Sequence, residues 1–168
     1  INAHDSGLGC VRQALLEAND GDTFDVDPAL KGQTIILTTA ELVISKSITI
    51  AGPGADLLAV SRAENAPAFR IFHVFAKLQV LIQGLTVSNN STDGTGGGIC
   101  VENNATMTIE RSTLNGNYAG DYGGGMANDG TILNNDCTLS DNRGEFAAGV
   151  PPKRFTEAPA LTRHTSPF

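Results

Sequence analysis

The sequence predicts an all-β protein: a right-handed parallel β-helix, or solenoid, with an N-terminal capping helix. Three observations predict this fold: a glycine triplet that recurs, an apolar-x-x-Asn motif that recurs with it, and apolar residues that alternate with polar ones in between. The composition agrees, because 19 Gly and only 17% charged residues suit many short strands joined by tight turns. A length of 168 residues suits one domain with a core.

The first predicted element is the capping helix, at about residues 11–18. Val11, Ala14, Leu15 and Ala18 fall on one face of this helix, and Asn19-Asp20-Gly21-Asp22 ends it. A solenoid exposes strand edges and core residues at its ends, so we expect this helix to cover the first coil.

Next comes a run of irregularly spaced strands. Each is a short apolar or β-branched segment, and a turn interrupts them at Ala51-Gly52-Pro53-Gly54-Ala55. The predicted strand segments are 34–37, 42–44, 47–50, 57–60 and 68–74. This region has the same architecture as the regular coils that follow, with less uniform spacing.

The regular coils begin near residue 78. Gly96-Gly97-Gly98-Ile99 returns 27 positions later as Gly123-Gly124-Gly125-Met126, and a weaker copy, Ala147-Ala148-Gly149-Val150, follows 24 positions after that. The apolar-x-x-Asn motif moves in step, at 87–90, 114–117 and 139–142. Stacking such units places equivalent strands side by side in parallel, about three strands to a coil.

Both motifs have a structural explanation. Glycine lets the backbone turn sharply, and no helical pattern follows either triplet, so a solenoid corner is favoured over a phosphate-binding loop. Asn tolerates left-handed backbone, and stacked Asn side chains can hydrogen-bond along the coil axis. The β-helix with its cap is therefore assigned to residues 1–150. Residues 151–168, where prolines cluster and alternation stops, are expected to form an irregular or disordered tail.

Several segments resemble large bacterial secreted β-helix proteins. Cys10-Val11-Arg12-Gln13-Ala14-Leu15 resembles their N-terminal Cys-Ser-Leu-Arg-Glu-Ala motif, and the Gly-Gly-Gly-Ile coils also resemble polymorphic outer-membrane protein repeats. The resemblance covers roughly residues 8–150 and implies a right-handed parallel β-helix, export and attachment to the cell surface. Such proteins are described as adhesin-like, or as pectate-lyase-like in fold. They carry more coils and a C-terminal anchor, so this chain resembles a truncated member.

The candidate chemistry of the coils is acidic. Asp93 and Asp121 each stand shortly before a glycine triplet, and one turn of a solenoid brings equivalent positions to the strand spacing of about 4.8 Å. As a carboxylate pair they are the catalytic candidates for polysaccharide cleavage. A solvated turn is the simpler interpretation. A Ca²⁺ ion at this corner is the remaining alternative, although the nonapeptide pattern of calcium-binding β-rolls is absent.

Tyr118 and Tyr122 flank a coil turn and are the candidate ligand-contact residues, because their rings could stack on sugars. No other cofactor is expected, since Cys10, Cys100 and Cys137 match no zinc spacing. Alternation along the strands predicts that Cys100 points outward and Cys137 inward.

The leading functional hypothesis is a non-catalytic extracellular or cell-surface module that binds carbohydrate or another surface ligand. The alternative is a polysaccharide lyase or glycoside hydrolase that uses carboxylates on the coil face. A net charge of −7 excludes the nucleic-acid backbone as a partner, and no apolar run is long enough to span a membrane. The chain begins at Ile1 without a signal peptide, so export rests on the resemblance. The open end of the solenoid is a possible oligomer contact.

Overall fold

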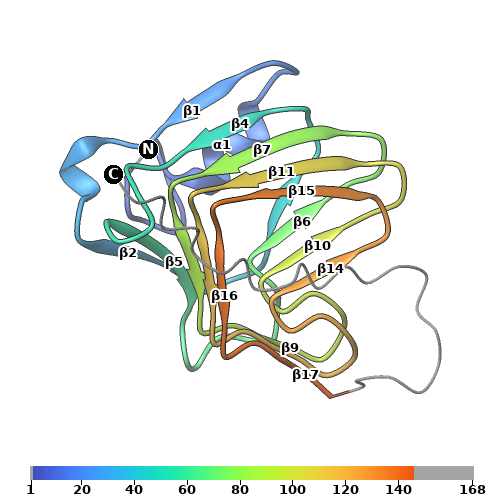
Figure 1. Ribbon diagram of the computed structural model, residues 1–168. Coiled ribbons are helices and arrows are strands. Elements are labelled where there is room, and N and C mark those ends of the chain that lie inside the picture. The colour runs from blue at the N-terminus through green and yellow to red at the C-terminus, as the bar shows by residue number, and fades with distance from the viewer. Residues whose placement is uncertain (1, 146–168) are drawn as a thin grey trace, which may run out of the picture.

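The computed structural model describes residues 2–145, which form a parallel β-solenoid with one short helix at its start. All paired strands run parallel, and they build four sheets along the solenoid axis (Figure 1). Sheet I contains β1 (Thr23–Asp25), β4 (Thr49–Ala51), β7 (Gln79–Gln83), β11 (Thr106–Glu110) and β15 (Thr131–Asn135). Sheet II contains β3 (Leu42–Ile44), β6 (Phe72–Val74), β10 (Ile99–Val101) and β14 (Met126–Asn128).

The two remaining sheets complete the circuit. Sheet III contains β2 (Gln33–Leu37), β5 (Leu58–Arg62), β8 (Thr86–Ser88), β12 (Thr113–Asn115) and β16 (Thr138–Ser140). Sheet IV contains β9 (Ser91–Thr92), β13 (Tyr118–Ala119) and β17 (Arg143–Gly144). A 3₁₀ turn, η1 (Pro28–Leu30), joins β1 to β2.

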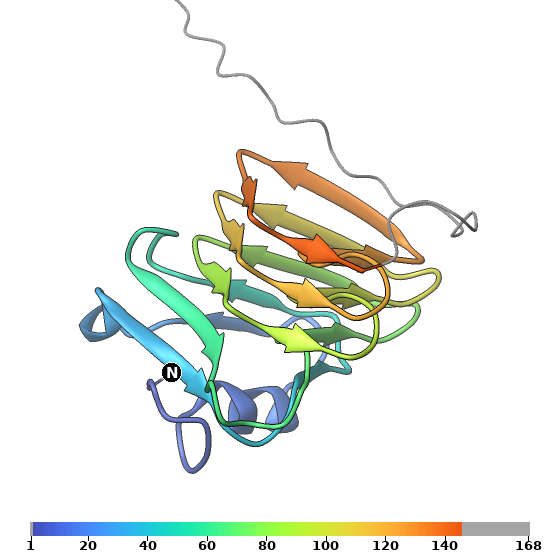
Figure 2. The ribbon, with the colours of Figure 1, turned by 90° about the horizontal axis from the view of Figure 1, so that it is seen from below.

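Each coil visits sheets II, I and III in that order, and the later coils add sheet IV. Figure 2 shows the coils stacked one on the next, with the helix α1 (Val11–Glu17) below them. The described strands complete four such circuits, which confirms the predicted parallel β-helix. The weak third glycine copy, at 147–150, and the predicted tail, at 151–168, lie outside the described residues.

The core is built from rows of inward side chains that stack from coil to coil. In sheet II, Leu42, Phe72 and Ile99 are register partners, and each is at most 1% exposed. Sheets I and III contribute equivalent rows, because period-2 alternation turns every second residue inward. The stack therefore buries apolar surface that a single coil would leave in water.

The corners between sheets use left-handed backbone at fixed positions. Gly84, Arg111 and Asp136 end the sheet I strands of successive coils, and their φ angles are 64°, 45° and 52°. The corner from sheet III to sheet IV likewise has left-handed residues at Asn89, Gly116 and Asp141. One left-handed residue redirects the chain into the next sheet, and Gly, Asn and Asp tolerate it best. Arg111 is the exception among these corner residues, because it adopts the left-handed conformation without being Gly, Asn or Asp.

The residue after the second corner forms an asparagine ladder, of which Asn90 and Asn117 are buried. The Nδ2 atom of Asn90 donates to Asn117 Oδ1 at 2.8 Å, and Asn117 Nδ2 donates to Asn142 Oδ1 at 2.9 Å. Stacking of the motif asparagines along the axis is thus confirmed. The left-handed conformation belongs to the preceding residue, however, because the ladder asparagine must turn inward to reach its neighbours.

The glycine triplets fit a close stack of backbones. Gly96 N, Gly97 N and Gly98 N each donate to a carbonyl of the next coil, at Tyr122, Gly123 and Gly124. A Cβ atom on Gly97 would overlap the carbonyl oxygens of Gly124 and Tyr118. These glycines are therefore required by shape, as their interpretation as solenoid corners predicts.

The helix α1 caps the first coil, within one residue of its predicted range. Val11 and Leu15 are buried against the core, and the Cys10 Sγ atom accepts a hydrogen bond from Gln13 N as the N-cap. Arg12 donates to the carbonyl oxygens of Ala40 and Glu41 at 2.7 and 2.8 Å. Arg12 thus attaches the cap to the chain just before β3.

The last described coil is less covered than the others. Leu139, the register partner of the fully buried Leu114, is 42% exposed, and Asn134 stands where Ile109 is buried in the coil before. Cys137 packs against the core as predicted. Strands β14 to β17 have a described partner on one side only.

Candidate functional site

The outer surface of sheet I is a regular surface built from five strands. Its outward side chains form three rows along the axis, which we call the polar face. The rows are Gln79, Thr106 and Thr131; Thr49, Leu81, Thr108 and Leu133; and Ala51, Gln83, Glu110 and Asn135. Hydroxyl and amide groups dominate these rows, with two leucines in the middle row.

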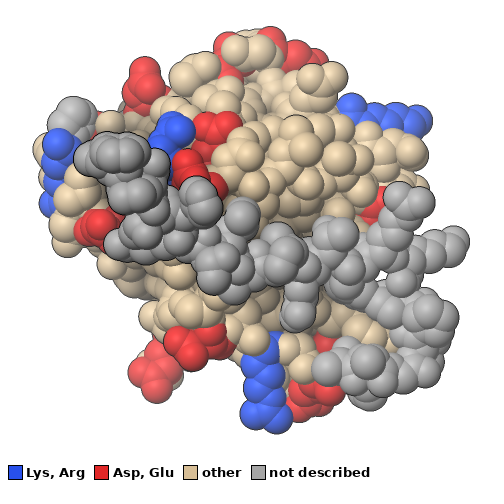
Figure 3. Space-filling model, viewed as in Figure 1, with Lys and Arg blue, Asp and Glu red and all other residues tan. Residues whose placement is uncertain are grey.

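A shallow groove of about 360 Å³ runs over one part of this face. Ser47, Thr49, Gln79, Thr106 and Thr108 contribute polar groups to its lining, together with Leu81. In Figure 3 the surface over β4, β7 and β11 is almost free of charged atoms, which lie at its margins. The groove therefore offers hydrogen bonding without a strong field of either sign.

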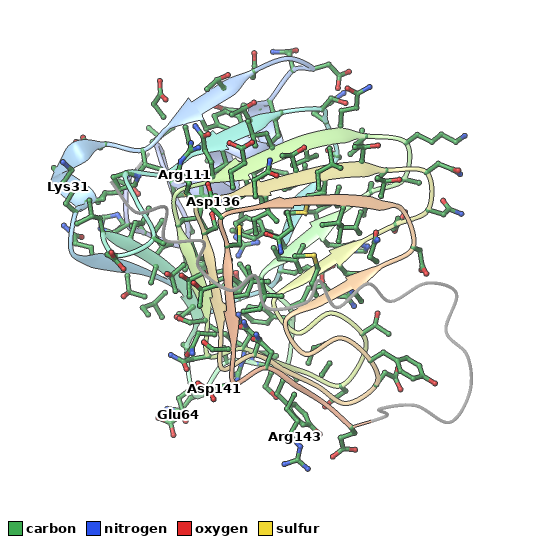
Figure 4. All side chains as sticks on the ribbon, in the orientation of Figure 1. Lys31, Glu64, Arg111, Asp136, Asp141 and Arg143 are labelled. Atoms are coloured by element: carbon green, nitrogen blue, oxygen red, sulfur yellow. The ribbon has the colours of Figure 1, made fainter. Side chains whose placement is uncertain are left out.

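A second groove, of about 480 Å³, follows the corner between sheets I and III. The turn at Gly52-Pro53-Gly54 forms one wall, and Arg111 and Asp136 lie at the other (Figure 4). The Arg111 guanidinium donates to Gln83 Oε1 at 2.8 Å and to Glu110 Oε2 at 3.2 Å. With Glu110 as its ion-pair partner and Asp136 in the lining of the same groove, this exposed guanidinium does not make the corner an anion site.

A charged cluster lies on the outer surface of sheet II. His73, in the middle of β6, has Nδ1 at 2.9 Å from Glu41 Oε1 and Nε2 at 3.0 Å from Glu102 Oε1. Arg70 Nε lies 3.1 Å from Glu41 Oε2 but is not aligned for a hydrogen bond, so this contact is an ion pair only. The Phe75 ring meets the imidazole edge-on, with centroids 5.1 Å apart.

The cluster shifts the ionisation of its members. The hydrogen bond to Glu41 raises the pKa of His73 above its ordinary value, against the opposing effects of burial and of Arg70. The hydrogen bond from His73 lowers the pKa of Glu41, despite burial, and Arg70 adds to this lowering. A glycosidase needs one carboxyl group with a raised pKa to act as the acid. Glu41, held ionised, is unsuited to that role.

Cys100 is beside His73 in the sheet but is not an activated nucleophile. It points to the outer side of sheet II, as predicted, with Sγ 3.9 Å from Thr95 Oγ1. Burial raises the pKa of its thiol, against the effects of Arg70 and Thr95, so the reactive thiolate is disfavoured. All three cysteines are free thiols.

The predicted carboxylate pair lies on adjacent coils, one position out of register. Ala119 pairs with Thr92, which places Gly120 opposite Asp93, and Asp121 N donates to Gly94 O at 3.2 Å. Their closeness to the glycine triplets had suggested equivalent positions, but the triplet starts three residues after Asp93 and only two after Asp121. Within residues 2–145, no three His, Cys, Asp or Glu side chains are grouped to hold a metal ion.

The two candidate tyrosines are remote from the polar face in the circuit. Tyr118 is in β13 of sheet IV, and its hydrogen bond to Glu145 raises the pKa of its phenol. Tyr122 follows in the loop before Gly123, where its carbonyl accepts from Gly96 N at 2.9 Å. They remain candidate contacts for a ligand on that side of the solenoid.

Sequence reasoning missed the cluster around His73. The repeat of 27 aligns His73 with Cys100, and Glu102 comes two residues later, so half of the cluster was accessible from the spacing. On the other side, the partner of His73 is Val43, which is 30 positions away. Glu41 could not be aligned because this upstream coil departs from the period.

Comparison of the chain with known protein families, with curated proteins and with solved structures found no match. The fold, a parallel β-solenoid, is therefore defined by the structure itself. Over the part of the chain described here, no helix has the length and apolarity needed to cross a membrane.

Proposed function

We propose that the protein is a non-catalytic extracellular or cell-surface module that binds an uncharged polysaccharide along the polar face. The observation that carries the proposal is the row structure of this face: hydroxyl and amide groups repeat at the strand spacing of about 4.8 Å, over a groove with few charges. A glycan chain presents hydroxyl groups and apolar C–H patches in alternation. Thr106 and Gln79 can hydrogen-bond with the former, and Leu81 can contact the latter.

Two further observations support this proposal over catalysis. Two carboxylates that converge on one point, Glu41 and Glu102, are both occupied by His73. The pKa of Glu41 is lowered by its hydrogen bond from His73, so this carboxyl group is not suited to protonate a leaving group. The location outside the cell is supported by the resemblance of the N-terminal motif and of the glycine coils to secreted bacterial β-helix proteins.

The test is affinity gel electrophoresis against a panel of neutral and acidic polysaccharides, with the same mixtures assayed for reducing ends and unsaturated products. We expect retardation by a neutral polysaccharide and no product. Replacing Gln79 and Thr106 together with Ala removes two hydrogen-bonding groups, so affinity falls about tenfold or more.

The matched control is Thr34→Ala, which removes an exposed threonine from the outer side of sheet III and leaves the polar face intact. It should bind as the wild type does. Retention by no polysaccharide, or retention that the double variant leaves unchanged, would contradict the proposal. Product that disappears in Asp121→Asn would favour the alternative, a polysaccharide-active enzyme.

A further inference from the structure

His73 lies between carboxylates that come from the coils on either side of it. Its strand, β6, is flanked in sheet II by β3 and β10, with Val43 and Cys100 as its register partners. Glu41 precedes β3 by one residue, and Glu102 follows β10 directly. One imidazole ring thus touches three successive coils.

The number of N–H donors that the imidazole ring needs decides the protonation state of His73. An ionised carboxylate only accepts hydrogen bonds, and a neutral imidazole has a single N–H group. Contacts of 2.9 and 3.0 Å on both ring nitrogens therefore require two N–H groups, which only the imidazolium ion has. A neutral ring would leave one nitrogen lone pair facing a carboxylate oxygen.

We infer that Glu41, His73 and Glu102 form a proton-dependent clamp, which holds three coils together while His73 is protonated and releases Glu102 when the proton is lost. Glu102 is the partner released because its side chain is 41% exposed, against 27% for Glu41, so water can replace the lost bond more fully. Glu41 also keeps the ion pair with Arg70.

The surrounding groups do not offer a substitute donor to Glu102. Arg70 faces Glu41, and the Cys100 thiol is paired with Thr95 Oγ1. Asp129, from the coil beyond, adds negative charge near Cys100. Glu102 Oε2 accepts from Ala76 N at 3.0 Å. Release of Glu102 therefore also affects the turn that leads from sheet II into β7.

The direction in which stability changes with pH follows from the pKa shifts of His73 and Glu41. The pKa of His73 is raised in the folded protein. Its contribution to stability is therefore complete below the pKa that His73 has in the unfolded chain, and it disappears as pH rises through the pKa in the folded chain. The pKa of Glu41 is lowered, so its contribution is present above the unfolded value and disappears as pH falls through the folded one. The clamp is closed in the window between them.

The test is an NMR titration of the histidine side chains in the whole chain, with His73 assigned from His73→Gln. We expect His73 to titrate above the ordinary histidine value, and the Ala76 amide resonance to move with the same midpoint. The urea midpoint of unfolding should fall over that pH range. In Glu102→Gln, the carboxamide can donate to the neutral ring, so His73 titrates lower and the pH-dependent loss of stability shrinks.

The control is Glu64→Gln, a substitution of the same type at an exposed turn away from the cluster, which should titrate as the wild type does. A His73 that titrates at or below the ordinary value would overturn the proposal. So would an unchanged His73 titration in Glu102→Gln. The wild-type titration decides the matter by itself if that variant fails to fold.

Discussion

At the scale of single residues, two backbone requirements shape each coil. Left-handed residues such as Asn89 and Gly116 make the corners, and glycines such as Gly97 allow two coils to touch backbone to backbone. The two requirements differ, since Gly97 lacks a positive φ and is demanded by space alone. The steric requirement can therefore be tested by adding a single Cβ atom at Gly97.

Gly97→Ala should destabilise the fold by about 2 kcal/mol or more, because the added methyl overlaps carbonyl oxygens of Gly124 and Tyr118 that cannot move without separating the coils. Gly94→Ala is the matched change in the same loop. There the nearest atom to a new Cβ is the end of the Arg70 side chain at 3.6 Å, so little or no loss is expected. Urea unfolding of both variants measures the difference, and equal losses would refute the steric account.

At the scale of elements, the cap depends on a polar anchor beside α1. Asp5 accepts hydrogen bonds from Arg12 at 2.6 Å and from the backbone and side chain of Thr38, each at 2.8 Å. Burial opposes its ionisation, but these bonds and those from Thr39 prevail and lower its pKa from 3.8 to about 2. The segment before the helix is thereby tied to the turn between β2 and β3.

Asp5→Asn should cost about 1 to 3 kcal/mol at neutral pH, because an amide group replaces one acceptor of this set with a donor. Since the folded pKa is lowered, the wild-type advantage is complete above 3.8 and declines as pH falls toward about 2. Unfolding measured from pH 7 to pH 2 checks this. Asp25→Asn, at an exposed end of β1, is the control and should show no comparable loss.

At the scale of the whole molecule, stability comes from stacking, and it weakens toward the last described coil. Inward positions that are fully buried in β11 and β12 are partly exposed in β15 and β16, and Leu133 on the polar face is 51% exposed. Asn134 continues the row of Ile82 and Ile109 with a polar group. The row thus ends with an inward residue that contributes little apolar burial.

Asn134→Ile should therefore raise the free energy of unfolding by about 1 kcal/mol, since the new side chain packs on Ile109. Asn135→Ile adds the same atoms one residue later, where the side chain points outward and Asn135 donates to Glu110 at 3.1 Å. It should give no gain. A larger gain from Asn135→Ile, in urea unfolding of the two variants, would show that the inward row does not continue through β15.

The predictable part of the molecule was the part with a period. The glycine triplets, the asparagine motif and the inward rows repeat about every 27 residues, so their stacking followed from spacing alone. The clustering of Glu41 with His73 did not follow, because the coil between them is longer than the period. The offset of Asp93 from Asp121 was missed for a related reason, since each was located from a nearby glycine and not from strand register.

The sequence by itself determined the fold class, the capping helix and the direction in which residues such as Cys137 point, since all three depend on local periodicity and on turn chemistry. Only the tertiary structure decided which side chains meet across coils. Stacking brings residues about 30 positions apart within hydrogen-bond distance, and a change of one or two residues in coil length changes every such meeting. That is why the polar face and the proton-dependent clamp at His73 became visible only in the folded chain.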